Sequence, residues 1–225
     1  MAAPGNDYLD LLDWRRRVAA LWTRWRVEGA HDPGAATEEF RRAKDELFRT
    51  HPQSPLPEAE RAAFPGLAYF PYDPSWRISA RFFLLDGGGG PHAEAVAAAP
   101  IALPSSGPGP LAMRRVGQVA LEGRLLGHHL AIFWIEGYGG GLFLPLLDRT
   151  SGNATYGAGR YLLDTLKSAD HGFDHQSGEL ILDLNMAFHP SCVYDPRWAC
   201  PLAPPENRLP VAVTAGERLS GEHAA

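Results

Sequence analysis

Residues 114–147 read RRVGQVALEGRLLGHHLAIFWIEGYGGGLFLPLL, and this stretch decides the fold class. It contains three runs rich in branched and aromatic side chains, at 114–123, 128–136 and 142–147, separated by glycine-containing turns. Gly123–Gly127 joins the first two runs and is too short for the crossover that parallel strands need. The pattern therefore predicts antiparallel strands that follow one another along the chain.

The chain on both sides of this stretch continues the same pattern. Further short strands are predicted at 67–72, 76–85, 101–103, 156–162, 179–185 and 209–213. Short strands with turn signals every dozen residues or so favour an antiparallel β-barrel or a β-sandwich. The glycines at 87–90 open a loop excursion rich in Gly, Ala and Pro, which we place at 86–110.

Two amphipathic helices are predicted before the strands, at 7–28 and 33–49. Asp32 is a suitable N-cap for the second helix. The first helix carries Trp22 and Trp25 on one side and arginines on the other. Such a helix could lie on a membrane surface, but we expect its tryptophan stripe to pack on the domain.

These elements predict a mainly β, α+β chain. Its 225 residues, 45% of them hydrophobic, are enough for one substantial core. We expect a helical segment at 1–57 that packs on the barrel, a barrel domain at 58–217 and a tail at 218–225.

Composition and motifs exclude several classes of function. The net charge of −5 argues against a nucleic-acid partner, which normally meets a basic face. We expect no membrane partner either, because no run of about 18 apolar residues is present. The N-terminus lacks the pattern of a signal peptide, which favours a cytoplasmic protein. The glycines at 137–141 precede a strand rather than a helix, so we expect no nucleotide cofactor.

Four polar residues on two predicted strands form the first candidate site. By the two-residue period, Tyr156 and Arg160 share one face of their strand, and Asp183 and Asn185 share one face of theirs. If the strands are neighbours, Arg160 could pair with Asp183. At a barrel mouth Arg160 would bind an anion, Asp183 and Tyr156 would be catalytic, and Asn185 would hydrogen-bond to the ligand. A structural ion pair that holds two strands in register explains the same pattern.

The segment 185–211 contains six prolines, several aromatic residues and both cysteines. Proline lacks a backbone donor, so we expect a rigid irregular loop here rather than a helix or a central strand. We expect this loop to form a lid across one end of the barrel. Glu206, Asn207 and Arg208 would then close the loop or contact a ligand.

His189, Cys192 and Cys200 form a second candidate site. Three nitrogen and sulfur donors could hold zinc, but their spacing matches no standard zinc signature. A disulfide is another alternative, and buried reduced thiols are the one we favour for a cytoplasmic protein. His171 and His175 lie in a polar loop, where we expect them in solvent.

Several blocks resemble a bacterial and archaeal family known only as a domain of unknown function, DUF1684. The blocks are YFPYD at 69–73, LFLPLLDRTSGNATYGAGRYL at 142–162, DLN at 183–185, PSC at 190–192 and CPLAPPENRL at 200–209. The resemblance implies one intact domain and supplies no catalytic residues. In this family the place of His189 is usually taken by Asn, which argues against a family-wide metal site.

We therefore expect a protein that binds a small polar or anionic ligand in the mouth of a β-barrel. Hydrolase-type chemistry is left open. The alternatives are a metal-binding protein that uses His189, Cys192 and Cys200, and a scaffold without catalytic activity. The N-terminal helix would bind the partner of such a scaffold, or join two copies of the chain as a homo-oligomer.

Overall fold

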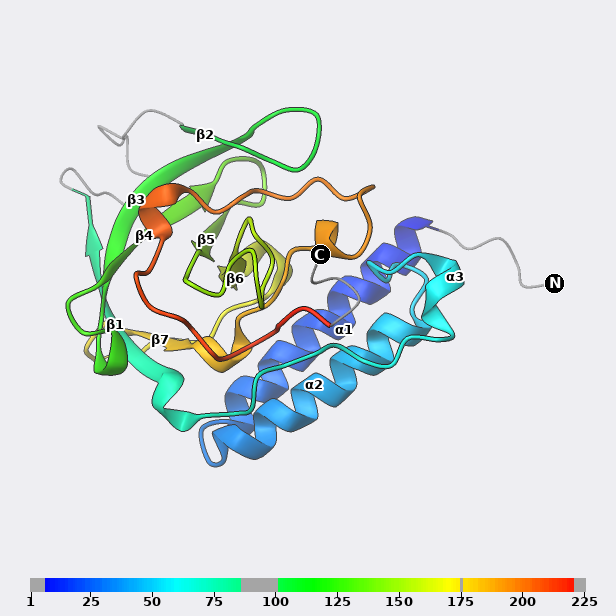
Figure 1. Cartoon of the computed structure of the whole chain (residues 1–225), viewed down its shortest axis with the longest axis horizontal. Helices are drawn as coiled ribbons and strands as arrows, with labels where there is room; N and C mark the ends of the chain where they lie inside the picture. Colours follow the sequence, from blue (N-terminus) through cyan, green and yellow to red (C-terminus); the bar gives the residue numbers. More distant parts are fainter. Residues whose placement is uncertain (1–6, 86–100, 175, 221–225) are drawn as a thin grey trace.

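The structure, a computed structural model, describes residues 7–85, 101–174 and 176–220, and its main feature is an antiparallel sheet of seven strands (Figure 1). The strands are β1 (Arg77–Leu84), β2 (Ile101–Leu103), β3 (Leu111–Leu121), β4 (His129–Ile135), β5 (Gly141–Leu146), β6 (Arg160–Asp164) and β7 (Leu180–Asp183). They lie in the order β6-β5-β4-β3-β1-β7, and β2 pairs with β3 outside this path. Every ladder is antiparallel, as the hairpin at 123–127 predicts.

The two ends of the sheet meet, so that the strands form a nearly closed barrel. Tyr161 of β6 and Phe188, which follows β7, exchange two backbone hydrogen bonds of 2.8 and 3.0 Å. Closure of this kind leaves few unpaired strand edges. The prediction of a barrel or sandwich preceded by two helices is thus confirmed in its barrel form.

Apolar side chains from the strands fill the barrel. Val119 of β3, Ile132 of β4, Leu144 of β5 and Leu182 of β7 belong to one cluster and are each 0% exposed. Burial of one such side chain contributes about 1.5–3 kcal/mol. This core accounts for the apolar character of the predicted strands.

Two long helices, α1 (Asp7–Glu28) and α2 (Pro33–Thr50), cover one side of the barrel, at the lower right of Figure 1. A short α3 (Glu58–Arg61) follows them. The side chain of Asp32 caps α2 as predicted, because it accepts a 2.9 Å hydrogen bond from the backbone N–H of Ala35.

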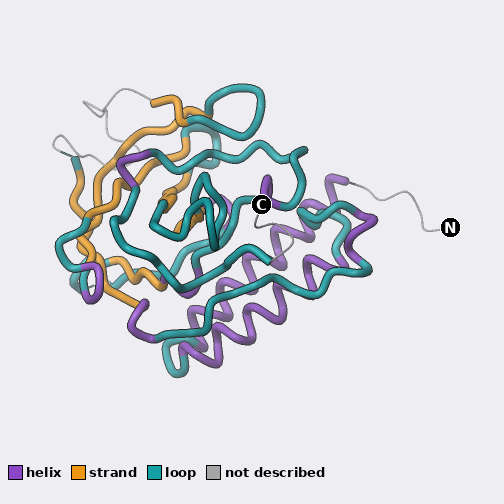
Figure 2. Tube along the Cα trace, viewed as in Figure 1, coloured by secondary structure: helices purple, strands orange, loops and turns teal. Residues whose placement is uncertain are grey.

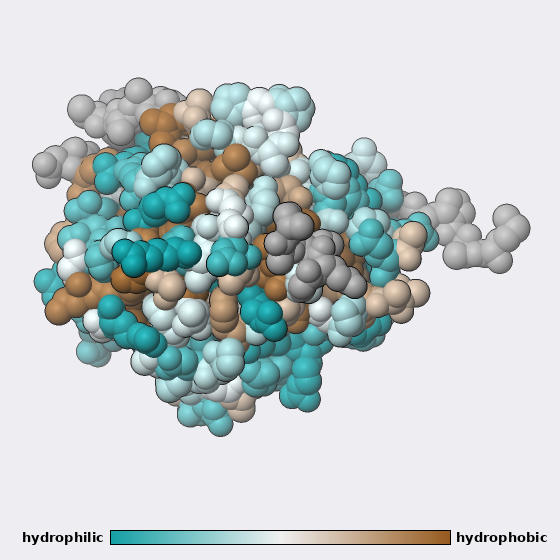
Figure 3. All heavy atoms as spheres, viewed as in Figure 1, coloured by the Kyte–Doolittle hydropathy of each residue, from teal (hydrophilic) through white to brown (hydrophobic). Residues whose placement is uncertain are grey.

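The tryptophan stripe of α1 packs on the domain, as expected. Trp22 and Trp25 are buried together with Phe40 of α2 and with Ala169 and Met186 of the barrel domain. The face that the helical layer turns to the viewer is largely hydrophilic (Figure 3). Among the described residues, none of the helices has the length and apolar character needed to cross a membrane.

The chain after β7 is mostly loop and crosses in front of the strands in the view of Figure 2. Short 3-10 helices interrupt this loop and several turns: η1 (Pro74–Trp76), η2 (Gly123–Leu125), η3 (Thr165–Lys167), η4 (Leu184–Met186), η5 (Ser191–Val193) and η6 (Pro205–Asn207). As predicted, residues 185–211 form neither an α-helix nor a strand longer than an isolated bridge.

Two predicted strands are absent from the sheet. The segment 67–72 makes only one bridge, between Tyr69 and Glu217. Pro71 follows closely, and a proline has no N–H with which to extend a ladder. The segment 209–213 runs beside residues 147–149 without forming a strand: Leu209 N–H donates to Leu147 C=O, and Val211 C=O accepts from Arg149 N–H.

Two other strands are shorter than predicted. The chain reaches β6 only at Arg160, because Gly159 takes a φ of +98° and closes a turn with Tyr156. Strand β7 ends at Asp183, where the chain turns into η4. Tyr156 therefore lies before β6, and Asn185 lies after β7. The prediction that Tyr156 shares a strand face with Arg160, and Asn185 with Asp183, is wrong.

The predicted excursion at 86–110 is only partly described. Its predicted short strand is confirmed as β2. Residues 86–100 lie outside the described residues, as do His175 and residues 221–225 of the predicted tail.

Candidate functional site

The expected ion pair between Arg160 and Asp183 is wrong, because each of the two side chains has another charged partner. Arg160 Nη2 donates instead to Asp148 Oδ2 over 2.9 Å, and both side chains are 0% exposed. The two terminal nitrogens of Arg160 also donate to three backbone carbonyl oxygens within residues 213–217. Arg160 therefore fastens the C-terminal segment to the barrel.

Asp183 and Asn185 hold the end of β7 in place. Asp183 Oδ2 lies 3.3 Å from Arg77 Nη1, and its Oδ1 accepts from the backbone and side-chain nitrogens of Asn185. Asn185 also accepts from Asp73 N–H and donates to Asp73 C=O. The two side chains thus join β7 to the chain that precedes β1.

Asn207 is a buried link between two strands. Its Oδ1 accepts from Ala131 N–H over 2.8 Å, and its Nδ2 donates to the carbonyl oxygens of Ala131 and Pro145. Through this side chain the predicted lid, residues 185–211, contacts β4 and β5.

The remaining predicted site residues lie apart from these. Tyr156 is half-buried beside Cys192, and burial together with that cysteine raises its pKa. Glu206 is largely exposed with its Oε2 3.5 Å from Arg115 Nε, and Arg208 is exposed. The seven predicted residues therefore do not form one pocket, and the catalytic roles expected of Asp183 and Tyr156 stay predictions.

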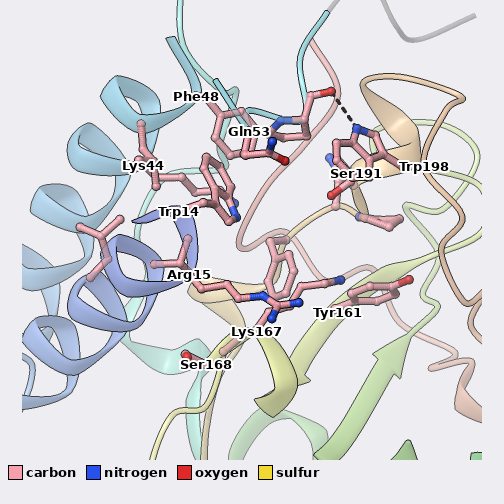
Figure 4. Close-up of a pocket in the computed structure, with 18 of the residues that line it drawn as sticks. Trp14, Arg15, Lys44, Phe48, Gln53, Tyr161, Lys167, Ser168, Ser191 and Trp198 are labelled. Carbon is pink, nitrogen blue, oxygen red and sulfur yellow. Dashed lines mark hydrogen bonds between the residues drawn. The ribbon is translucent and has the colours of Figure 1, made fainter. Parts of the chain in front are cut away.

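A cavity of about 590 Å³ lies elsewhere, between the helix pair and the barrel (Figure 4). Its walls come from α1, α2, the chain at 53–55, β6 with η3, and the loop at 188–200. None of the seven predicted site residues lines it.

Aromatic and aliphatic side chains together form most of the cavity walls. Trp14 of α1 and Phe48 of α2 have ring centroids 6.1 Å apart, and Tyr194 packs edge-on against Phe48 at 5.4 Å. Tyr161 and Phe188, the residues that close the barrel, form another part of the wall. Trp198 is held by a 3.2 Å hydrogen bond from its Nε1 to the carbonyl oxygen of Pro55, drawn dashed in Figure 4.

Three cationic side chains and no carboxylate are found among the described residues that line the cavity. Lys44 is paired with the buried carboxylate of Glu217. Lys167 is 58% exposed and lies 2.9 Å from Asp164. Arg15 is exposed and has no carboxylate within 4 Å in the described part of the chain. In Figure 4 Arg15 and Lys167 reach into the same side of the cavity.

His189 is engaged in a structural role. Its Nε2 accepts from the backbone N–H of Tyr156 over 3.3 Å, and the backbone N–H of His189 donates to Glu217 Oε2 over 2.7 Å. Burial lowers the pKa of His189 to about 4, against the opposing effect of Glu217, so the imidazole is neutral at pH 7.

The metal site expected as an alternative has no support in this geometry. In the residues that the structure describes, no group of three or more His, Cys, Asp or Glu side chains could hold a metal ion. Cys192 and Cys200 are free thiols, the first half-buried and the second buried. His171, expected in solvent, is only 2% exposed, which makes that expectation wrong.

A sequence signal for the cavity did exist. The chain has only two lysines among its 21 basic residues, Lys44 and Lys167, and both line the cavity. The sequence could not show that the two lysines lie at the same cavity, because α2 and η3 are more than 100 residues apart.

The comparison with known families agrees with the blocks noted in the sequence. The model of DUF1684, a protein of unknown function, matches residues 62–218. The chain belongs to the DUF1684 family. The matched DUF1684 region contains every strand and the C-terminal segment, whereas α1 and α2 lie before it.

A solved structure is similar over a longer part of the chain. It is the solution NMR structure of an uncharacterized protein from gene locus rrnAC0354 of Haloarcula marismortui, with 29% sequence identity and a TM-score of 0.57. The alignment covers 87% of this chain and 99% of that one. A search of curated proteins gives no match. Neither DUF1684 nor the archaeal structure names an activity, so function rests on the geometry of the site.

Proposed function

We propose that the cavity between the helix pair and the barrel binds a small organic acid. The apolar body of the ligand would lie against the aromatic walls, and its anionic group would lie beside Arg15 and Lys167. The proposal keeps the anionic ligand expected from the sequence and moves it from the barrel mouth to this cavity. The observation that supports it most is an apolar cavity, rich in aromatic rings, with three cations and no carboxylate among its described lining residues.

The size of the cavity supports a ligand rather than a packing gap. Ligand sites usually have volumes of about 300–1,000 Å³ and mainly apolar walls with a few polar groups. A cavity of about 590 Å³ falls in this range. A medium-chain fatty acid or an aryl acid is therefore of suitable size.

The electrostatics support an anion. Charges of one sign around a low-dielectric hollow concentrate the potential inside it. Glu217 compensates Lys44, and Asp164 compensates Lys167 in part, which leaves Arg15 as the least compensated charge. Arg15 and Lys167 are thus the side chains that we assign to the anionic group.

A fluorescence titration with 8-anilinonaphthalene-1-sulfonate, an anionic aromatic probe, tests the proposal. We expect saturable binding, and displacement of the probe by dodecanoate but only weakly by dodecanol, which has the same chain without the charge. Arg15→Gln should weaken dodecanoate binding roughly fivefold, since one partly solvated charge contact contributes about 1 kcal/mol.

Arg16→Gln is the matched control, because Arg16 is the exposed neighbour of Arg15 and does not line the cavity. It should leave the affinity for dodecanoate unchanged. Equal displacement by dodecanol and dodecanoate, or equal effects of the two substitutions, would show that the cavity does not select an anion.

A further inference from the structure

Some polar side chains in the cavity wall have no hydrogen-bond partner inside the protein. The hydroxyl of Tyr194 is satisfied, because it donates to Glu217 over 3.0 Å. The indole N–H of Trp14, the side-chain amide of Gln53 and the hydroxyl of Ser191 make no hydrogen bond to the described part of the chain. All three side chains are half-buried. A ligand that expels water from them must therefore supply hydrogen bonds of its own.

His51 holds Trp14 and Gln53 next to each other. The ring centroids of Trp14 and His51 are 5.3 Å apart, in an edge-to-face arrangement. The Nδ1 atom of the same histidine accepts a 3.0 Å hydrogen bond from the backbone N–H of Gln53. The chain that follows α2 therefore presents Gln53 beside the indole of α1.

Ser191 reaches the same part of the cavity through Tyr194. The backbone N–H of Tyr194 donates to the carbonyl oxygen of Ser191 over 3.0 Å. The ring of Tyr194 packs 5.4 Å from that of Phe48, and Phe48 lies 6.1 Å from Trp14. We call Trp14, Gln53 and Ser191 the polar subsite of the cavity.

The polar subsite lies away from the two cations assigned to the anionic group. In Figure 4 the amide of Gln53 points into the cavity from the side opposite to Arg15 and Lys167. Trp14 and Arg15 are consecutive, but neighbouring side chains of an α-helix point about 100° apart. The cavity thus has a cationic end and an uncharged polar end.

The donors and acceptors of the polar subsite match a hydroxyl group. The indole N–H of Trp14 can only donate, whereas the amide of Gln53 and the hydroxyl of Ser191 can both donate and accept. A hydroxyl group also does both, so it can accept from the indole and donate to the amide oxygen. A carboxylate would only accept, and it would lie away from Arg15 and Lys167.

We propose that the ligand of the cavity is a hydroxy acid whose hydroxyl group binds in the polar subsite. This inference rests on the proposed function and adds the substrate class to it. The acid group lies beside Arg15 and Lys167, and an apolar chain or ring spans the cavity between the two ends. An acid without the hydroxyl group leaves the polar subsite either hydrated or unpaired, which lowers its affinity.

Displacement of anilinonaphthalene sulfonate by matched pairs of acids tests the inference. The pairs are octanoate, decanoate and dodecanoate, each compared with the acid of equal length that carries a hydroxyl group on its last carbon. For at least one length the hydroxy acid should bind about three- to tenfold more tightly, the effect of one net hydrogen bond. A purely apolar wall would have the opposite effect, because burial of an unpaired hydroxyl group weakens binding.

Two variants assign the preference to the polar subsite. Gln53→Leu should abolish the preference for the hydroxy acid and leave the affinity for the parent acid nearly unchanged. Trp14→Phe, which keeps an aromatic ring but removes the N–H, should reduce the preference. Gln118→Leu is the matched control, because Gln118 is a half-buried glutamine of β3 that does not line the cavity.

The outcomes separate this inference from the proposed function. Weaker binding of the hydroxy acid at every length, or a preference that survives both Gln53→Leu and Trp14→Phe, would overturn the polar subsite alone. An unchanged affinity of Arg15→Gln for the parent acid would contradict the anion site, while a hydroxyl preference lost in Gln53→Leu would still support the subsite. If no acid displaces the probe, both proposals fail.

Discussion

Asn207 shows how one side chain compensates for a proline inside a sheet. Pro145 of β5 has no N–H, so the carbonyl oxygen opposite it on β4 loses its ladder donor. The amide of Asn207 enters at this point and bonds to both strands, through Ala131 and Pro145. Because the site is fully buried, water cannot replace these bonds.

Asn207→Ala should lower the free energy of unfolding by about 3 kcal/mol, since it leaves buried backbone groups without partners. Urea denaturation of the two proteins measures this difference. Asn153→Ala, at an exposed turn residue, is the matched control and should change stability little. Similar losses in both variants would mean that Asn207 has no special role.

At the scale of elements, His171 couples helix α1 to the barrel. Its ring lies 5.6 Å from that of Trp22 and 5.3 Å from that of Trp25, and its Nδ1 accepts from the N–H of Asp183 at the end of β7. Burial, assisted by nearby arginines, lowers the pKa of His171 to about 3. The contact between helix and strand thus requires a neutral imidazole.

This contact predicts a loss of stability in mild acid. The unfolded chain takes up a proton at His171 below about pH 6.5, but the folded chain does so only near 3. Stability is therefore complete above pH 6.5 and falls as the pH drops through this window, by about 1.4 kcal/mol per pH unit. His189, with its pKa lowered to about 4, acts in the same direction.

Urea denaturation at neutral pH and at about pH 5 measures the slope, before most carboxylates titrate. His171→Asn keeps an acceptor for Asp183 N–H but cannot titrate in this range, so its slope should be smaller than that of the wild type. An identical slope in the wild type and the variant would show that protonation of His171 does not cause the loss of stability in acid.

At the scale of the whole molecule, the helix pair is part of the fold rather than an appendage. Trp22 and Trp25 bury their rings against the barrel domain, and α1 also supplies one wall of the cavity. The helices precede the DUF1684 region, so this cavity is shared between that region and the segment before it.

Deletion of residues 1–29 should therefore destabilise the protein. The loss of two buried tryptophans alone corresponds to about 5 kcal/mol. Thermal unfolding followed by circular dichroism is the measurement. An unchanged melting temperature would favour the partner-binding role that the sequence left open for this helix.

The sequence predicted the elements better than the site. The strands at 114–147 and the cap at Asp32 depend on local patterns, and they are confirmed. Asp148, the charged partner of Arg160, lies only 12 residues before it, but the carbonyl groups that Arg160 also binds are more than 50 residues away, which no local pattern encodes. The cavity was missed for the same reason, because its walls come from three distant parts of the chain.

The partners of Arg160 also set the order in which the chain can fold. Its guanidinium binds Asp148 and the carbonyl groups of residues 213–217. Strand β1 likewise pairs with β7, which follows it by about 100 residues in the chain. Such long-range contacts make folding slow, and they cannot form until residue 217 has left the ribosome. During synthesis the strands that emerge first therefore keep unpaired edges until β7 and Phe188 have left the ribosome.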